Sequence, residues 1–326
     1  GRSLLQITFD RFKDLVPTEN IYIVSNAAYK DLIISQLPSM NPDHILLEPM
    51  RRNTAPCIAY ATYKIKSRCE DANIIVVPSD HLITDETEYI RVLRQGLDFV
   101  DKNRRSLLTL GMKPTRPETG YGYIQKGAYT GTGDIYKVQA FTEKPDRDFA
   151  RMFMESKEWY WNTGLFLSNA RHLQQSLSRI LPSLLHTEER TEEMATIEAE
   201  DAFMQENFSL YPNMSLDYAV LEKSDNVYVM KCDFGWADLG TWHGLYEAMS
   251  RREGDNVIIN SDIILENATN NIVKMPEGRL AVINGLDGYI VAEKDNVLFI
   301  CKKEDSSALV RKYVNEIQMK RGEDFV

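Results

Sequence analysis

Three polar segments of the sequence each follow directly on a short apolar run: 48–56, 78–81 and 233–240. Because ligands of open α/β sheets bind beyond the carboxyl ends of the strands, charged and amide side chains at such positions favour a binding site. Each segment alone has a structural alternative, since Asp80 and Thr54 are both residue types that cap helices. Their expected convergence on one edge of one sheet predicts a shared site for a small ligand.

Glycine and aromatic residues mark further candidate positions. Gly120 and Gly122 bracket Tyr121, an arrangement that lets backbone approach a ligand closely and offers an aromatic face to a sugar ring. A turn with core tyrosines explains the same pattern equally well. Lys144 follows the end of an expected strand, where a lysine is usually a solvated surface charge, and Asn162 stands beside a glycine between aromatic residues.

Several common catalytic motifs are absent from the sequence. It has no GxxxxGK[ST] loop, no HExxH and no GxSxG, which argues against a P-loop nucleotidase, a zincin and a hydrolase with a nucleophile elbow. The glycine-rich segment 131–134 precedes an expected strand, so it predicts a hairpin turn. The five histidines are scattered without ligand spacing, which argues against a structural zinc site.

The elements that must position these residues follow from hydrophobic patterning. Short runs that are apolar throughout predict strands buried on both faces of a sheet: 21–24, 45–47, 74–77 and 107–110. Amphipathic helical patterns lie between them, including one over 86–101. This alternation predicts a doubly wound α/β fold with a mixed, mainly parallel sheet.

The pattern changes beyond residue 252. Short β runs alternate with Asn, Asp and Gly turns, and a helical pattern near 305–319 closes the chain. We therefore expect a large domain over 1–252 and a small β-rich domain over 253–326, for which a β-helical winding is one arrangement.

Composition limits the partners. The chain of 326 residues has 38 Lys and Arg against 48 Asp and Glu, a formal net charge of −10. Such a chain is a poor non-specific ligand for nucleic acid or an anionic membrane. No apolar run approaches the roughly 18 residues of a membrane span, and the four cysteines form no CxxC pair. We expect a cytoplasmic protein with reduced thiols and with neither a nucleic-acid nor a membrane partner.

Seven blocks, in one order, closely resemble the mannose-1-phosphate guanylyltransferases, also called GDP-mannose pyrophosphorylases. They are EPMRRNTAP, PSDH, PTRPETGYGYI, FTEKP, WNTGLF, SLDYAVLEK and FGWADLGTW. The resemblance is dense over 1–252 and weaker beyond. It implies the Rossmann-like fold of the nucleotide-diphospho-sugar transferases, with 1–252 as the catalytic domain, and the length suits the short form with a single activity.

The resemblance implies transfer of GMP from GTP to mannose 1-phosphate, giving GDP-mannose and pyrophosphate, with Mg²⁺ as cofactor. A sugar phosphate oxygen is already anionic near neutrality, so the site must supply positioning and charge neutralisation rather than an activated nucleophile. By the resemblance, Asp80 and Asp238 hold the Mg²⁺ and Lys144 neutralises the sugar phosphate.

The resemblance also assigns substrate-binding residues. Glu143 and Asn162 would hydrogen-bond sugar hydroxyls, and Gly122 would present its backbone to the hexose. Asp217 would lie close to the sugar or orient the groups around it. Arg52, Asn53 and Thr54 are assigned to the nucleotide side of the site. Pro78 and Ser79 are assigned to positions near the base and the ribose.

The sequence departs from the family at its beginning. The family opens with a central strand and a glycine-rich loop that carries an arginine and cradles the triphosphate. This chain matches the family only after that segment. Since losing a central buried strand would expose apolar surface on both neighbours, we expect the real polypeptide to carry a further N-terminal segment.

Two alternatives stay open. One is another nucleotide or hexose 1-phosphate on the same scaffold. The other is a non-catalytic regulatory subunit that binds a sugar nucleotide, which the missing loop favours and the carboxylates and Lys144 oppose. A homodimer is a possible assembly, with the tail serving either packing or self-association.

Overall fold

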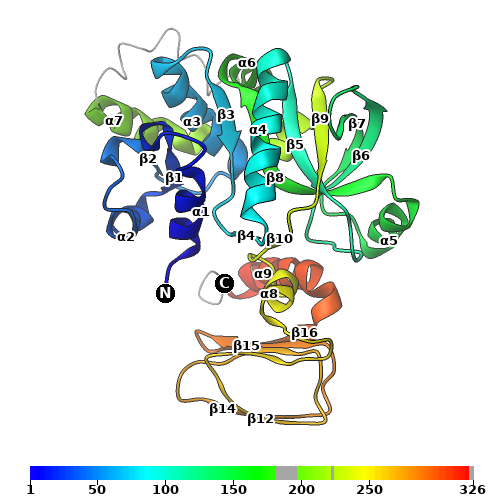
Figure 1. Ribbon diagram of the computed structural model, residues 1–326. Coiled ribbons are helices and arrows are strands. Elements are labelled where there is room, and N and C mark those ends of the chain that lie inside the picture. The colour runs from blue at the N-terminus through cyan, green and yellow to red at the C-terminus, as the bar shows by residue number, and fades with distance from the viewer. Residues whose placement is uncertain (181–196, 222–223, 323–326) are drawn as a thin grey trace.

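The computed structural model describes residues 1–180, 197–221 and 224–322, which form a large α/β region and a smaller β-rich region (Figure 1). The central sheet has the strand order β3-β8-β5-β9-β7-β6. Its strands are β3 (Asn73–Val76), β5 (Leu107–Met112), β6 (Tyr123–Tyr129), β7 (Ile135–Thr142), β8 (Trp159–Asn169) and β9 (Val227–Cys232). A separate parallel pair consists of β1 (Ile23–Asn26) and β2 (Ile45–Glu48).

The central sheet is mixed, as expected. β5 and β9 are parallel, whereas β8 runs antiparallel to β3, β5 and β6. Antiparallel pairing is therefore more extensive than the expected mainly parallel arrangement, because β8 is antiparallel to its three neighbours and β7 is antiparallel to both β6 and β9. Among the described residues, β1 pairs only with β2, and β3 pairs only with β8. No described strand lies between β1 and β3, and the central strand expected in a further N-terminal segment stays a prediction.

Helices cover both faces of the central sheet: α4 (Glu86–Lys102) on one face, and α3 (Thr54–Arg68), α6 (Ala170–Ile180) and α7 (Ile197–Asn207) on the other. Alternate residues of β5 supply the two cores. Leu107 packs with the α3 and α6 side, while Leu108 and Leu110 pack with α4. This doubly wound arrangement was predicted from the apolar runs.

Local signals account for the element boundaries. The apolar runs at 21–24, 45–47, 74–77 and 107–110 form β1, β2, β3 and β5, and the glycine-rich segment 131–134 connects the antiparallel strands β6 and β7. α4 begins where the Asp85 carboxylate accepts a hydrogen bond from the Glu88 N–H. The other α-helices that the structure describes in the large region are α1 (Leu4–Phe12), α2 (Lys30–Gln36), α5 (Arg147–Ser156) and α8 (Trp242–Met249).

The β-rich region is wound as a coil. Its strands are β11 (Val257–Ile259), β12 (Asp262–Glu266), β13 (Ile272–Lys274), β14 (Leu280–Asn284), β15 (Tyr289–Lys294) and β16 (Val297–Lys302). From β11 to β15, consecutive strands alternate between two sheets, and all their pairs are parallel. Asn271 is fully buried and bonds to Asn256, Leu286 and Tyr289, joining successive turns of the coil.

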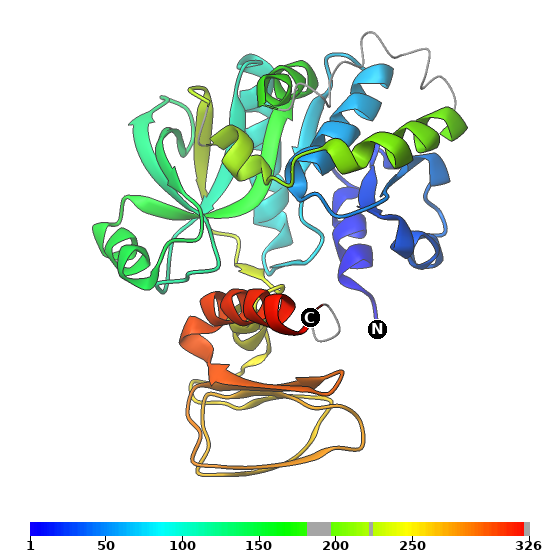
Figure 2. The same cartoon turned by 180° about the vertical axis from the view of Figure 1, so that it is seen from behind.

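The closing helix α9 (Ser306–Arg321) lies with α8 between the coil and the central region in both views (Figures 1 and 2). In the part of the chain that the structure describes, none of the helices has the length and apolar character needed to cross a bilayer.

Candidate active site

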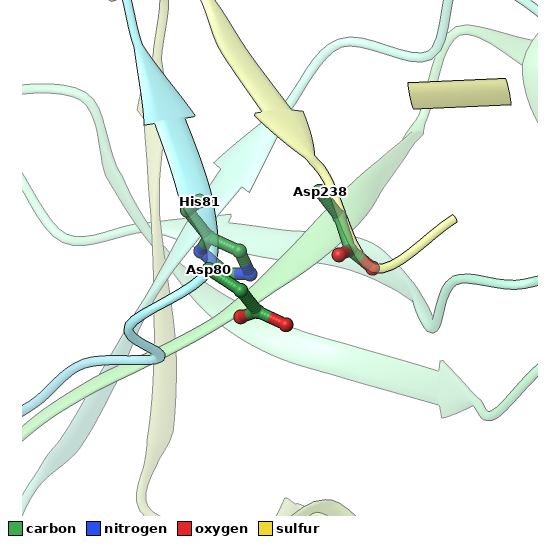
Figure 3. Close-up of side chains that lie close together, drawn as sticks. All are labelled: Asp80, His81 and Asp238. Atoms are coloured by element: carbon green, nitrogen blue, oxygen red, sulfur yellow. The ribbon is translucent and has the colours of Figure 1, made fainter. Parts of the chain in front are cut away.

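A short antiparallel pair brings two distant segments together. β4 (His81–Ile83), which follows β3, pairs with β10 (Trp236–Asp238), which follows β9, and places Asp238 opposite His81. The backbone carbonyl of Asp80 accepts a hydrogen bond from the Leu239 N–H at 3.2 Å. One side-chain ligand atom from each of Asp80, His81 and Asp238 lies within 4.8 Å of the others (Figure 3). The structure thus brings together the two acids that the resemblance assigned to the metal.

These two acids, the carboxylate pair, have an environment that suits a divalent cation. Burial raises the pKa of Asp238 to about 6; the hydrogen bond from the Gly240 N–H lowers it, and the charge of Asp80 raises it further. A Cβ on Gly240 would lie 3.0 Å from Asp238 Oδ1 and 3.2 Å from Asp80 Oδ2, so glycine keeps the space beside both carboxylates open. Mg²⁺ prefers carboxylate oxygens and would offset the repulsion between the two charges, so the residues present fit this cation.

His81 is a poorer ligand than the two acids. The Trp236 indole N–H donates to His81 Nδ1 at 3.1 Å, so a neutral imidazole carries its proton on Nε2 and offers a donor there. Burial lowers the pKa of His81 to about 4, although the charge of Asp80 partly opposes this effect. The low pKa keeps the ring neutral near pH 7. His81 therefore orients this edge, and the two carboxylates are the better candidate ligands for a cation.

A second cluster gathers the residues that the resemblance assigned to the sugar. The Asn162 N–H donates to the Gly122 carbonyl at 2.8 Å, and the Asn162 side-chain amide donates to Asp217 Oδ1 at 2.5 Å. Lys144 Nζ lies 3.0 Å from Glu143 Oε1. A Cβ on Gly122 would lie 2.8 Å from Glu143 Oε2, so a larger residue would displace that carboxylate. We call these five residues the sugar cluster.

Lys144 links the sugar cluster to the carboxylate pair. Burial raises the pKa of Asp217 to about 6, and the charge of Glu143 raises it further. The charge of Lys144 lowers the pKa of both Asp217 and Asp238, so the ammonium acts on both groups of acids. Lys144 has a positive φ of 45°, uncommon for a residue with a side chain, and its side chain is 46% exposed. The ammonium is therefore accessible to an incoming anion.

The nucleotide-side residues make mainly structural contacts. Asn53 caps α3 through the Thr54 N–H, and the Thr54 hydroxyl accepts a hydrogen bond from the Leu216 N–H at 2.9 Å. The Arg52 guanidinium donates to a backbone carbonyl at 2.7 Å. These bonds anchor the start of α3 to the segment that leads into Asp217. No hydrogen bond or ion pair among the described residues joins Arg52, Asn53 or Thr54 to the carboxylate pair.

Pro78 and Ser79 connect β3 to the carboxylate pair. The Ser79 carbonyl accepts a hydrogen bond from the Thr8 hydroxyl at 3.2 Å, which ties this connection to α1. Pro78 Cγ lies 3.6 Å from where a Cβ on Gly164 would stand. The structure therefore places these two residues beside the pair, between α1 and β8.

Sequence reasoning did not assign two residues at this edge. Glu48 ends β2; burial raises its pKa to about 7, and its buried Oε1 has no hydrogen-bond partner among the described residues. Arg116 stacks over the Trp161 ring at 4.9 Å and pairs with Glu118 and Glu247. Both lie inside blocks that carry the resemblance, EPMRRNTAP and PTRPETGYGYI, so their position in those blocks was the available signal.

Comparisons with known proteins identify the family of this chain. Residues 1–255 match the family model described as nucleotidyl transferase. A mannose-1-phosphate guanylyltransferase of Escherichia coli is 32% identical and is aligned over 97% of this chain and 69% of its own length. One of Sinorhizobium fredii is 32% identical over 93% of this chain and 59% of its own length. This chain therefore spans between about three fifths and just over two thirds of these relatives.

A solved structure, described as mannose-1-phosphate geranyltransferase from Thermus thermophilus, has a TM-score of 0.78 and 26% identity to this chain. The alignment covers 98% of this chain and 90% of that one, so it includes the β-rich coil. These findings confirm the resemblance that the seven sequence blocks indicated. The chain belongs to the nucleotidyl transferase family and, within it, to the mannose-1-phosphate guanylyltransferases.

Proposed function

We propose that this chain transfers GMP from GTP to mannose 1-phosphate. A phosphate oxygen of the sugar phosphate forms a bond to the α-phosphorus of GTP, and the bond from that phosphorus to the oxygen bridging to the β-phosphorus breaks. The electron pair leaves with pyrophosphate, and GDP-mannose is the second product. The observation that carries this proposal is the carboxylate pair beside a lysine-bearing sugar cluster, in a chain of this family.

Catalysis in this proposal is a matter of position and charge. Asp80 and Asp238 would hold Mg²⁺, which when bound supplies positive charge against the α-phosphate. Lys144 binds the sugar phosphate, since its ammonium acts on both the carboxylate pair and the sugar cluster. No side chain has to remove a proton, because the attacking oxygen is already anionic.

The sugar cluster offers hydrogen-bond groups for a hexose. Glu143 and Asp217 carry carboxylate oxygens that accept from sugar hydroxyls. Asn162 is held by the Gly122 carbonyl, by Asp217 and by the Thr109 hydroxyl at 2.9 Å, so its amide has a fixed orientation. A site that is preformed in this way loses less entropy when it orders its ligand.

Guanine recognition is proposed for Glu48. Its carboxylate, whose Oε1 has no hydrogen-bond partner in the described parts of the chain, can accept hydrogen bonds from the N1–H and 2-amino groups of guanine. Adenine and uracil do not present that pair of donors. We propose Pro78 and Ser79 near base and ribose, and Arg52, Asn53 and Thr54 along the nucleotide, where their bonds to the 209–216 segment hold the start of α3.

Location and assembly extend the proposal. Cys57, Cys69 and Cys232 form no disulfide in the structure, which suits the reducing cytoplasm that we propose. We treat 1–252 as the catalytic domain and 253–326 as a β-rich domain that supports a homodimer. On one face of the β12–β14 sheet, Ile264, Leu280 and Val282 are exposed, and apolar faces of this kind mark protein interfaces.

A pyrophosphate-release assay tests the proposal. GTP, ATP and UTP are each paired with mannose 1-phosphate and glucose 1-phosphate. We expect the highest kcat/KM with GTP and mannose 1-phosphate. A preference for another pair would refute the substrate assignment. Absence of turnover with every pair, together with tight binding of GDP-mannose, would favour the regulatory subunit.

A further inference from the structure

The C-terminal helix reaches the catalytic domain at one defined place. α9 follows the last strand of the coil and lies against the central region in both views (Figures 1 and 2). There it meets the turn 118–122, the glycine and aromatic segment between β5 and β6. This turn belongs to the catalytic domain and is held locally by Arg116 and Tyr123, while two further side chains that hold it come from a helix about 190 residues further along the chain.

Two side chains of α9 bind this turn directly. The Ser307 hydroxyl donates to Glu118 Oε1 at 3.0 Å, and the Arg311 guanidinium donates to the Thr119 carbonyl at 3.1 Å. Glu118 is only 6% exposed, and its Oε1 also accepts from the Gly120 N–H at 2.8 Å. A Cβ on Gly120 would lie 2.7 Å from Ser307 Oγ, so the helix approaches as closely as glycine allows.

The other end of the turn belongs to the sugar cluster. The Gly122 carbonyl accepts the Asn162 N–H at 2.8 Å, and the missing Cβ of Gly122 leaves room for Glu143. Within the turn, the Tyr123 hydroxyl donates to the Glu118 carbonyl at 3.0 Å. Only a few residues of backbone therefore separate Glu118 from the groups that hold Asn162 and Glu143.

We propose that Ser307 and Arg311 are positioning residues for sugar-phosphate binding. They fix the turn 118–122 from outside the catalytic domain and would act on the sugar cluster only through this turn. A buried carboxylate that loses a hydrogen-bond donor is destabilised, so Glu118 would move toward solvent without Ser307 and carry the turn with it. This inference rests on the proposed function and adds to it a role for the C-terminal helix.

The first test needs no turnover. Hydrogen–deuterium exchange of a peptide spanning 118–124 is compared among the wild type, Ser307→Ala, Arg311→Ala and the control Asn315→Ala, which lies at an exposed position of the same helix. We expect the Gly120 amide region to exchange at least about fivefold faster in the first two variants and unchanged in the control. Unchanged exchange in all variants would overturn the proposal, even for a protein that proved inactive.

The second test uses initial-rate kinetics with GTP and mannose 1-phosphate. Both positioning variants should raise the KM for mannose 1-phosphate at least about fivefold and leave the KM for GTP within about twofold, with partial recovery in Arg311→Lys. Equal increases in both KM values, or losses that follow the change in Tm, would show a merely structural role and overturn the proposal. A wild type inactive with every substrate pair would refute the proposed function, while hydrogen exchange would still decide whether α9 holds the turn.

Discussion

Asp217→Asn should make the protein more stable and less active. The Asp217 carboxyl has its pKa raised to about 6, chiefly by burial, against 3.8 for the ordinary group. The group is still mostly ionised at neutral pH, but holding that charge in the folded protein costs stability relative to the unfolded chain. The amide of the variant keeps an oxygen that can accept the Asn162 bond, so the substitution removes the charge and preserves the contact.

The sign and size follow from linkage. A raised folded-state pKa means that the folded protein holds its proton more tightly than the unfolded chain, so the stability present below pH 4 is lost as pH rises through about 6. At about 1.36 kcal/mol per pKa unit, the free energy of unfolding falls by about 3 kcal/mol at pH 7.5 and by about 1.6 kcal/mol at pH 5, relative to the fully protonated group. The stability gain of the variant should therefore grow by about 1.4 kcal/mol between these two values.

Urea unfolding followed by tryptophan fluorescence measures this gain at pH 5, 6 and 7.5, with Asp225→Asn as a control at an exposed position. The KM for mannose 1-phosphate is measured on the same samples and should rise about tenfold or more, because a charged hydrogen bond to the sugar is lost. A variant that is less stable at every pH, or whose gain does not change with pH, would refute the reasoning.

Three further predictions concern single side chains. Glu48→Gln should raise the KM for GTP about tenfold and that for ITP, which lacks the 2-amino group, by less; equal increases would remove Glu48 from base recognition. Gly240→Ala should raise the Mg²⁺ concentration needed for half-maximal rate, since its Cβ would stand 3.0 and 3.2 Å from the two carboxylates; an unchanged Mg²⁺ profile would contradict this. Lys144→Met should raise the KM for mannose 1-phosphate about a hundredfold, because a charge-assisted contact to the phosphate is lost. The inhibition constant of free mannose, a competing ligand without a phosphate, should not change. An increase in the KM for GTP alone would show that Lys144 does not bind the sugar phosphate.

Hydrophobic patterning was sufficient for β1, β2, β3, β5 and α4, because each is a local apolar or amphipathic run. It could not predict the β4–β10 pair. Each of these strands has three residues, too few for a periodic signal, and their register depends on where β3 and β9 end in space. The metal assignment therefore came from family resemblance, and the structure supplied the proximity.

The same limit explains Thr54. Its sequence context favoured either a helix cap or a nucleotide contact, yet its hydroxyl accepts from the Leu216 N–H, 162 residues away. A single sequence carries no local trace of such a bond. In the coil, frequent Asn, Asp and Gly residues predicted turns, whereas the parallel register that stacks Asn256 on Asn271 appears only in the folded chain.

Binding of Mn²⁺ to the carboxylate pair is the most direct test of the central claim. Titration of the ion, followed by electron paramagnetic resonance with GDP-mannose present, compares the wild type with Asp80→Asn, Asp238→Asn and the nearby control Asp233→Asn. The account predicts at least about tenfold weaker Mn²⁺ binding in the first two variants and, for Asp238→Asn, pyrophosphate release about a hundredfold slower, equivalent to about 2.7 kcal/mol. Wild-type Mn²⁺ affinity and turnover in Asp238→Asn would contradict it.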